Sequence, residues 1–174
     1  MNYKEAERLL IRTNKKQPNV IRHCKAVSKL AYSIAKQIKK NGYDVDPEKT
    51  RIAALLHDIG RAISHENHEF EGAKMLRKIG EKELADMILR HGCSAVIAKD
   101  LCIPGDFEPK TIEEKIVAYC DGRFDTDKLV TLKQRYALLK KRATKERWKT
   151  IVKTKPRAFR TEKEINKMMK TKVS

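Results

Sequence analysis

The chain has 174 residues, which is enough for one ordinary hydrophobic core and too short for two full domains. Apolar residues make up 40% of the chain, which excludes a disordered polypeptide, and no apolar run approaches the roughly 18 to 20 residues that a membrane span needs. The 40 Lys and Arg against 23 Asp and Glu give a net charge of +17, which favours anionic partners such as nucleotides or nucleic acid.

Hydrophobic residues recur at helical spacing along almost the whole chain, after a short amphipathic start. No alternating pattern of useful length predicts a strand, and residues 105–109 read as a loop. The sequence therefore predicts an all-α fold, a single-domain helical bundle. The expected helices run from Pro18 to near Asn41-Gly42, from Asp46 to His57-Asp58, from about Asn67 to Ile79, from Glu81 to His91 and from Thr111 to Phe124.

Charge divides the chain near residue 125. Residues 126–174 carry 17 Lys and Arg against 4 Asp and Glu, whereas residues 1–125 have a net charge of only +4. We expect residues 17–125 to form the main domain and residues 126–174 a basic helical C-terminal extension packed on it. The basic side of the extension should face water. Its charge could attract substrate, bind RNA or DNA non-specifically, or serve solubility.

Two helical segments are expected in this extension. Apolar residues keep helical spacing from Leu129 to Ala143. Pro156 should interrupt the pattern, and a last short helix should cover Thr161–Met169, with Thr161 and Glu164 as its capping box.

Four cysteines are spaced unlike a zinc site or a disulfide framework, so we expect reduced, buried thiols. The amino terminus lacks the pattern of a signal peptide. These features favour a cytoplasmic protein.

Four of the five histidines and one aspartate lie on the apolar faces of their own helices. One such histidine alone is more often an ordinary core residue than a ligand. Several on separate helices, with a carboxylate whose burial needs a cation, favour one shared divalent metal site. Imidazole and carboxylate donors without thiolate suit Mn, Fe, Ni, Co or Zn. The residues are His23, His57, His68, His91 and Asp121, with Asp58 beside His57.

The same residues carry a family resemblance. His23, the run Leu-Leu-His-Asp-Ile-Gly-Arg at 55–61 and Asp121 in Ala-Tyr-Cys-Asp-Gly-Arg resemble the HD superfamily of metal-dependent phosphohydrolases, specifically its HDIG branch, over residues 17–125. For a mononuclear site the resemblance implies the ligands His23, His57, Asp58 and Asp121. For a dinuclear site it adds His68 and His91.

The stretch His68-Glu-Phe-Glu-Gly-Ala with the later Ile-Leu-Arg-His91-Gly is similar to bacterial HD hydrolases that split diadenosine tetraphosphate symmetrically. The likeness to cyclic-dinucleotide phosphodiesterases is more distant, because a Gly-Tyr-Pro motif is missing and Arg61 replaces the usual Lys. His65 remains unassigned, as a ligand or a loop residue near the mouth of the site.

In a dinuclear arrangement, His23, His57 and Asp121 would hold one ion and His68 and His91 a second, with Asp58 bridging. Two such ions would activate water and neutralise charge on a phosphoryl group. We therefore expect a phosphohydrolase with a small phosphorylated substrate, such as a nucleotide, and with Asp58 as a catalytic residue.

Three cations are candidate contacts for the phosphate. Arg61 is the leading nominee as a catalytic and substrate-binding residue, because Gly60 before it would let phosphate approach the backbone. Arg123 and Lys99 are weaker nominees, and each could instead be a solvated surface cation.

Two other functions stay open. The same six ligands could hold a mixed-valent di-iron pair and support an oxygenase, or the metal could stabilise a non-catalytic module that binds RNA through its tail. A mononuclear hydrolase is also open. The sequence leaves the oligomeric state undetermined.

Overall fold

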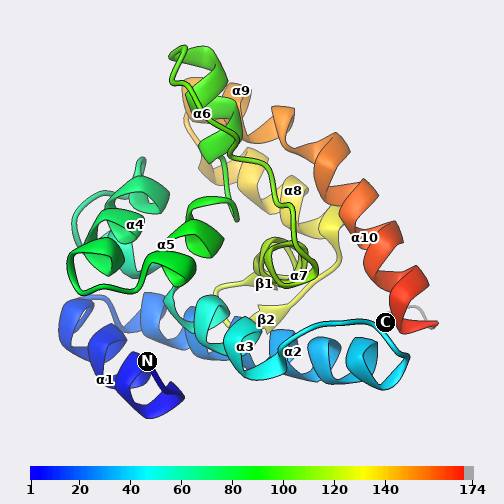
Figure 1. Ribbon diagram of the computed structural model, residues 1–174. Coiled ribbons are helices and arrows are strands. Elements are labelled where there is room, and N and C mark those ends of the chain that lie inside the picture. The colour runs from blue at the N-terminus through cyan, green and yellow to red at the C-terminus, as the bar shows by residue number, and fades with distance from the viewer. Residues whose placement is uncertain (171–174) are drawn as a thin grey trace.

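The computed structural model describes residues 1–170, which form a bundle of short helices with one small two-stranded ribbon (Figure 1). The expected all-helical architecture is confirmed. Within the described residues, no helix combines the length and apolar character needed to cross a membrane. The elements are α1 (Tyr3–Thr13), α2 (Pro18–Lys40), α3 (Pro47–Leu56), η1 (Ile59–Ala62), α4 (His68–Lys78), α5 (Lys82–Leu89), α6 (Ser94–Asp100), α7 (Ile112–Asp121), β1 (Phe124–Asp125), β2 (Lys128–Leu129), α8 (Leu132–Arg142), α9 (Lys145–Lys153) and α10 (Lys155–Met169).

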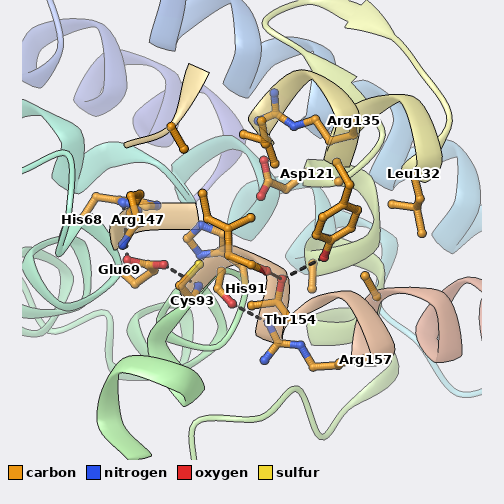
Figure 2. Close-up of a pocket in the computed structure, with 18 of the residues that line it drawn as sticks. His68, Glu69, His91, Cys93, Asp121, Leu132, Arg135, Arg147, Thr154 and Arg157 are labelled. Atoms are coloured by element: carbon orange, nitrogen blue, oxygen red, sulfur yellow. Dashed lines mark hydrogen bonds and ion pairs between the residues drawn. The ribbon is translucent and has the colours of Figure 1, made fainter. Parts of the chain in front are cut away.

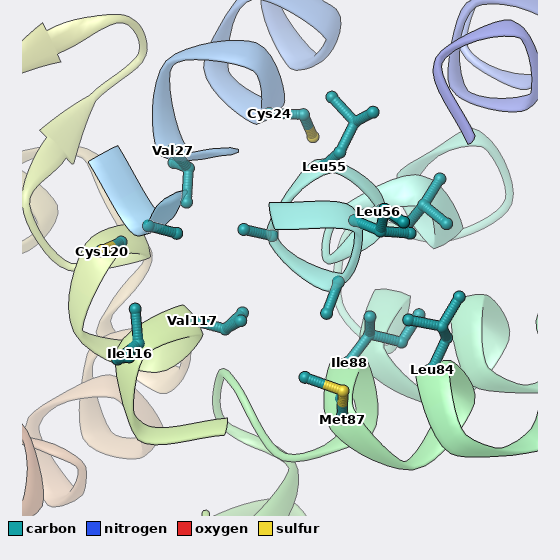
Figure 3. Close-up of a cluster of buried hydrophobic side chains, with 14 of the residues drawn as sticks. Cys24, Val27, Leu55, Leu56, Leu84, Met87, Ile88, Ile116, Val117 and Cys120 are labelled. Atoms are coloured by element: carbon teal, nitrogen blue, oxygen red, sulfur yellow. The ribbon is translucent and has the colours of Figure 1, made fainter. Parts of the chain in front are cut away.

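The longest of the described helices, α2, lies along one side of the bundle (Figure 1). It lies against α3 and α7, while α1 and α5 pack on α3 and α4 packs on α5 (Figure 1). Apolar side chains at helical spacing on these elements, among them Val27, Leu55, Leu56, Ile88 and Val117, meet in one cluster from which water is excluded (Figure 3).

Several helices end earlier than their patterns predict. Helix α3 stops at Leu56 rather than Asp58, because the chain turns there into the 3-10 turn η1. Helix α7 stops at Asp121, where Gly122 begins the turn into the β1–β2 ribbon. Helix α6, which follows His91, was not predicted because it has only seven residues. The helix ends thus place His57, Asp58 and Asp121 where the backbone changes direction.

The extension folds differently from the expectation around Pro156. The proline lies in the first turn of α10, where its missing N–H breaks no helical hydrogen bond. Helix α10 is therefore continuous through Thr161, which lies in mid-helix and is not an N-cap. The expected capping box of Thr161 and Glu164 is wrong for this reason.

Helix α10 packs against α7 and α2, and α8 and α9 join it in a layer on one side of the bundle (Figure 1). The charge boundary near residue 125 falls within the β1–β2 ribbon. Residues 171–174, the end of the expected extension, lie outside the described residues.

The thiols are free, as expected, but only Cys24 and Cys120 are buried in the core. Cys93 is half-buried and Cys102 is exposed. The expectation that all four thiols are buried is therefore wrong for Cys93 and Cys102.

Gly60 in η1 allows this turn to press against α4. A Cβ atom on Gly60 would lie 2.1 Å from the carbonyl oxygen of His68 and 2.5 Å from the backbone nitrogen of Gly72. The space beside Gly60 is thus filled by protein backbone and does not admit a phosphate, contrary to the expectation. The glycine instead fixes the position of Asp58 and His68 relative to each other.

We predict that Gly60→Ala lowers the free energy of unfolding by about 1–3 kcal/mol, because backbone atoms cannot yield to the added methyl group without moving η1 off α4. The measurement is urea denaturation followed by circular dichroism. Ile63→Ala is the matched control, because Ile63 follows the same turn but is 60% exposed. Equal stability of the two variants would contradict this packing.

Candidate functional site

The six side chains proposed from the sequence as metal ligands converge at one place in the interior. The closest approaches are 3.0 Å between His23 Nε2 and Asp121 Oδ1, and 3.0 Å between His68 Nε2 and Asp58 Oδ1. Three overlapping sets of donor atoms each have the spacing to hold a metal ion. These sets are His23–His57–Asp58, His57–His91–Asp121 and Asp58–His68–His91.

Asp58 lies at the centre, and its two carboxylate oxygens face different histidines. Its Oδ2 atom is 3.9 Å from His23 Nε2 and 3.7 Å from His57 Nε2. Its Oδ1 atom is 3.0 Å from His68 Nε2 and 3.8 Å from His91 Nε2. Oδ1 is buried and has no hydrogen-bond partner among the described residues. A buried carboxylate oxygen without a hydrogen-bond partner is typical of a site that binds a cation.

Each of the four imidazole rings is oriented by a hydrogen bond between its Nδ1 atom and a backbone carbonyl oxygen. A carbonyl oxygen can only accept, so each Nδ1 carries a proton and each ring turns its Nε2 atom toward the cluster, where a neutral ring offers a lone pair. This arrangement of outer hydrogen bonds is typical of histidines that bind metals. The Nδ1 atoms of His23, His57, His68 and His91 donate to the carbonyl oxygens of Thr126, Ala54, His65 and Ile88.

Neighbouring groups keep the two aspartates of the cluster ionised although both are buried. Burial opposes ionisation of Asp58, but the Arg61 guanidinium and the nearby imidazoles hold the pKa of Asp58 well below its usual value. Burial likewise opposes ionisation of Asp121, yet the neighbouring His23 and His57 rings hold its pKa well below its usual value. Both carboxylates are therefore ionised and available to a cation.

The pKa values of three of the imidazoles shift in different directions. Burial lowers the pKa of His57, which keeps this ring neutral. Burial also acts to lower the pKa of His23 and His91, but the nearby Asp121 and Asp58 carboxylates outweigh it, and both pKa values are raised above 6.5. Protons and metal ions would therefore compete at His23 and His91.

Arg61 lies beside the cluster. Its Nε donates to Asp58 Oδ2 at 2.5 Å, and its side chain lines the adjoining cavity. No hydrogen bond is made by its two terminal nitrogens within residues 1–170. His65 is exposed at the rim of the same cavity and turns its carbonyl oxygen to His68.

The other two nominated cations are not brought to the cluster. Arg123 is 2% exposed, and its guanidinium donates to the Val130 carbonyl oxygen and to the Tyr119 hydroxyl, which ties the ribbon to α7. Lys99 lies on the exposed side of α6. Neither residue lines the cavity beside the cluster.

A cavity of about 310 Å³ opens beside the cluster, between it and helices α8–α10 (Figure 2). The extension was expected to turn its basic side to water, and its lysines up to Lys170, where the described residues end, are exposed. Four of its arginines instead line the cavity, and sequence reasoning missed them. A planar guanidinium can lie partly buried along such a wall, whereas the lysine ammonium is more strongly hydrated. The four are Arg135, Arg142, Arg147 and Arg157.

Glu69 is a second feature that sequence reasoning missed. It is fully buried, and its Oε1 atom accepts the backbone N–H of Cys93 at 2.7 Å. Its Oε2 atom lies 3.3 Å from His68 Nδ1. Gly92 makes room for this carboxylate, since a Cβ atom there would lie 2.3 Å from Oε1. Adjacency to His68 was the available signal, but acidic residues are common in the first turn of any helix.

The chain is similar to several curated relatives over part of its length. It is 44% identical over 110 residues to an uncharacterized protein of Methanocaldococcus jannaschii, which is 60% of this chain and 65% of that protein. It is 33% identical over 132 residues to a tRNA (cytidine(56)-2'-O)-methyltransferase of Picrophilus torridus, which is 72% of this chain and 37% of the relative. Ribonuclease Y of Alkaliphilus metalliredigens is 39% identical over 118 residues, 66% of this chain and 21% of the relative.

The matched region thus spans less than two thirds of each of these relatives. No solved structure gives a significant match. The model of the HD domain family matches residues 20–123, which include all six residues of the buried cluster. With the converging histidines and aspartates, this match establishes that the chain belongs to the HD domain family.

Proposed function

We propose that this protein is a metal-dependent phosphohydrolase that acts on a nucleotide or another small phosphorylated substrate. The observation that carries the proposal is the position of Asp58, whose two oxygens face two separate sets of Nε2 atoms. When bound, a pair of divalent ions supplies an activated water and positive charge for the phosphoryl group.

In this proposal His23, His57 and Asp121 would hold one ion, His68 and His91 would hold the second, and Asp58 would contribute to both. Asp58 suits this role because a carboxylate has two donor oxygens, whereas an imidazole offers one lone pair. The chemistry of the donors fits Mn, Fe, Ni, Co or Zn. The backbone hydrogen bonds at the Nδ1 atoms orient the rings before any ion arrives.

The protein's own residues would then bind and orient the phosphate. Arg61 holds Asp58 through Nε and leaves its terminal N–H groups to donate to phosphate oxygens. Asp121 is 26% exposed at its side chain and lies on the wall of the cavity, so a substrate there reaches the cluster directly. The buried Glu69 carboxylate lies 3.3 Å from His68 Nδ1 and adds negative charge beside this ring.

The substrate class follows from the size and charge of this cavity. A volume of about 310 Å³ suits a small molecule, and five arginines on its wall favour a phosphorylated one. Diadenosine tetraphosphate, which the segment from His68 to Ala73 suggests, belongs to this class. The name ribonuclease Y denotes cleavage of RNA, a chain of phosphodiesters, and supports hydrolysis at a phosphate.

Metal analysis with Asp58→Asn tests the proposal. We expect the wild type to bind about two divalent ions per chain and to hydrolyse members of a panel of phosphomonoesters, phosphodiesters and nucleoside polyphosphates with Mn²⁺. Asp58→Asn should lose an ion and more than about a hundredfold in turnover while remaining folded, because the bridging carboxylate is gone. Asp44→Asn, at an exposed residue, is the control with the same chemical change.

Other results would point elsewhere. Absence of bound metal together with inertness on the whole panel would overturn the hydrolase. Iron-dependent oxygen consumption, with no turnover by redox-silent Mn²⁺ or Zn²⁺, would indicate an oxygenase. RNA binding that survives Asp58→Asn, with no hydrolysis by the wild type, would indicate a non-catalytic module.

Acid should weaken metal binding. The pKa values of His23 and His91 are raised above 6.5 in the metal-free protein, so both rings gain protons as the pH falls through that region. A protonated ring has no lone pair for a metal. We expect the affinity for Mn²⁺, measured by calorimetry, to fall about tenfold or more from pH 8 to pH 6. An affinity that is equal at both pH values would argue against these two ligands.

A further inference from the structure

The C-terminal extension faces the cluster with an arginine wall, which we define as Arg135, Arg142, Arg147 and Arg157. These residues lie beyond residue 123, where the match to the family model ends. The wall is therefore a feature of the extension. Glu69 and Asp121 are the acidic residues that line the same cavity, so the lining is strongly cationic.

Three of the four guanidinium groups already have partners. Arg135 and Arg142 both donate to the Asp125 carboxylate. Arg157 donates to Glu108 Oε2 at 3.2 Å and to the carbonyl oxygen of Gly92. These contacts fix the shape of the wall.

Arg147 differs from the other three. Its side chain lines the cavity and is only partly exposed, yet within residues 1–170 it makes no side-chain hydrogen bond or ion pair. Figure 2 shows it on the side of the cavity where Glu69 and Cys93 lie. A partly desolvated guanidinium without a carboxylate partner is suited to bind an anion.

Helix α9 turns Arg147 toward the cavity. It contains no fully buried residue, and its inward positions Arg147 and Ile151, with Thr154 at its end, line the cavity. The helix is held by the ion pair of Lys153 with Asp100 on α6, and by the hydrogen bond between Tyr136 and Thr154 at 2.8 Å. The position of Arg147 is thus fixed by contacts that do not involve its own charge.

We propose that Arg147 binds a second phosphate of a small substrate whose scissile phosphoryl group lies at the histidine–aspartate cluster. The inference rests on the proposed function and adds the substrate class: a compound with at least two phosphate groups. Arg61 and Arg147 line the same cavity of about 310 Å³, alongside the apolar side chains of Leu132 and Tyr136, against which a nucleoside can pack.

Binding to the full chain after chelator treatment tests the subsite without any turnover. Calorimetry with adenosine 5'-diphosphate should show about tenfold weaker binding to Arg147→Gln than to the wild type, because a charge-assisted bidentate contact is lost. Lys149→Gln is the matched control, since it removes the same charge from an exposed position on the same helix. Its affinity should stay within about twofold of wild type. Circular dichroism checks that both variants fold.

Kinetics with Mn²⁺ separates the subsite from the proposed activity. For adenosine 5'-diphosphate, Arg147→Gln should raise KM about tenfold with little change in kcat. For p-nitrophenyl phosphate, which has one phosphate, KM should change less than about twofold. An effect on diphosphate binding without hydrolysis by the wild type would overturn the hydrolase and retain the subsite.

Three results would overturn the subsite itself. The first is diphosphate binding that Arg147→Gln leaves unchanged, and the second is equal weakening by Lys149→Gln, which would indicate only long-range attraction. The third is a single-stranded RNA of twelve nucleotides that binds tenfold more tightly than the diphosphate and loses this affinity in Arg147→Gln. That result would assign Arg147 to a polynucleotide instead.

Discussion

The buried carboxylate of Asp58 is the constraint on which the rest of the site depends. An ionised aspartate inside a protein is costly unless positive charge surrounds it. Here burial opposes ionisation of Asp58, but Arg61, His57 and His68 hold its pKa well below its usual value. One carboxylate oxygen still has no hydrogen-bond partner in the described part of the chain. A divalent ion shared with the imidazoles would satisfy it, which is why the proposal of a metal centre starts from this residue.

The fold places five of the six residues of the cluster at or next to helix ends. His57, Asp58 and His91 follow the ends of helices, His68 begins one and Asp121 ends one. At such places the backbone turns and its carbonyl oxygens are free to accept hydrogen bonds. The Nδ1 atoms of His57 and His91 use carbonyl oxygens three residues earlier in this way. The same turns that end the helices therefore orient the rings.

The basic extension joins the site through its arginines. The lysines of α8–α10 remain in water and account for much of the net charge, whereas four arginines turn toward the cavity. The lysines and the arginines of the extension thus have different surroundings. In the proposed function, the four arginines at the cavity would select a phosphorylated substrate, and the Arg147 subsite would favour one with a second phosphate.

The sequence by itself determined the helical class, the buried core and the candidate ligands, because helical spacing and the chemistry of His and Asp are local properties. Only the tertiary structure decided that Arg123 ties the ribbon to α7, that Gly60 makes room for α4, and that Arg147 faces the cavity. An arginine has the same local pattern whether it meets water, a carboxylate or a cavity. What it meets depends on segments far away in the chain, and their arrangement is fixed only when the helices pack together.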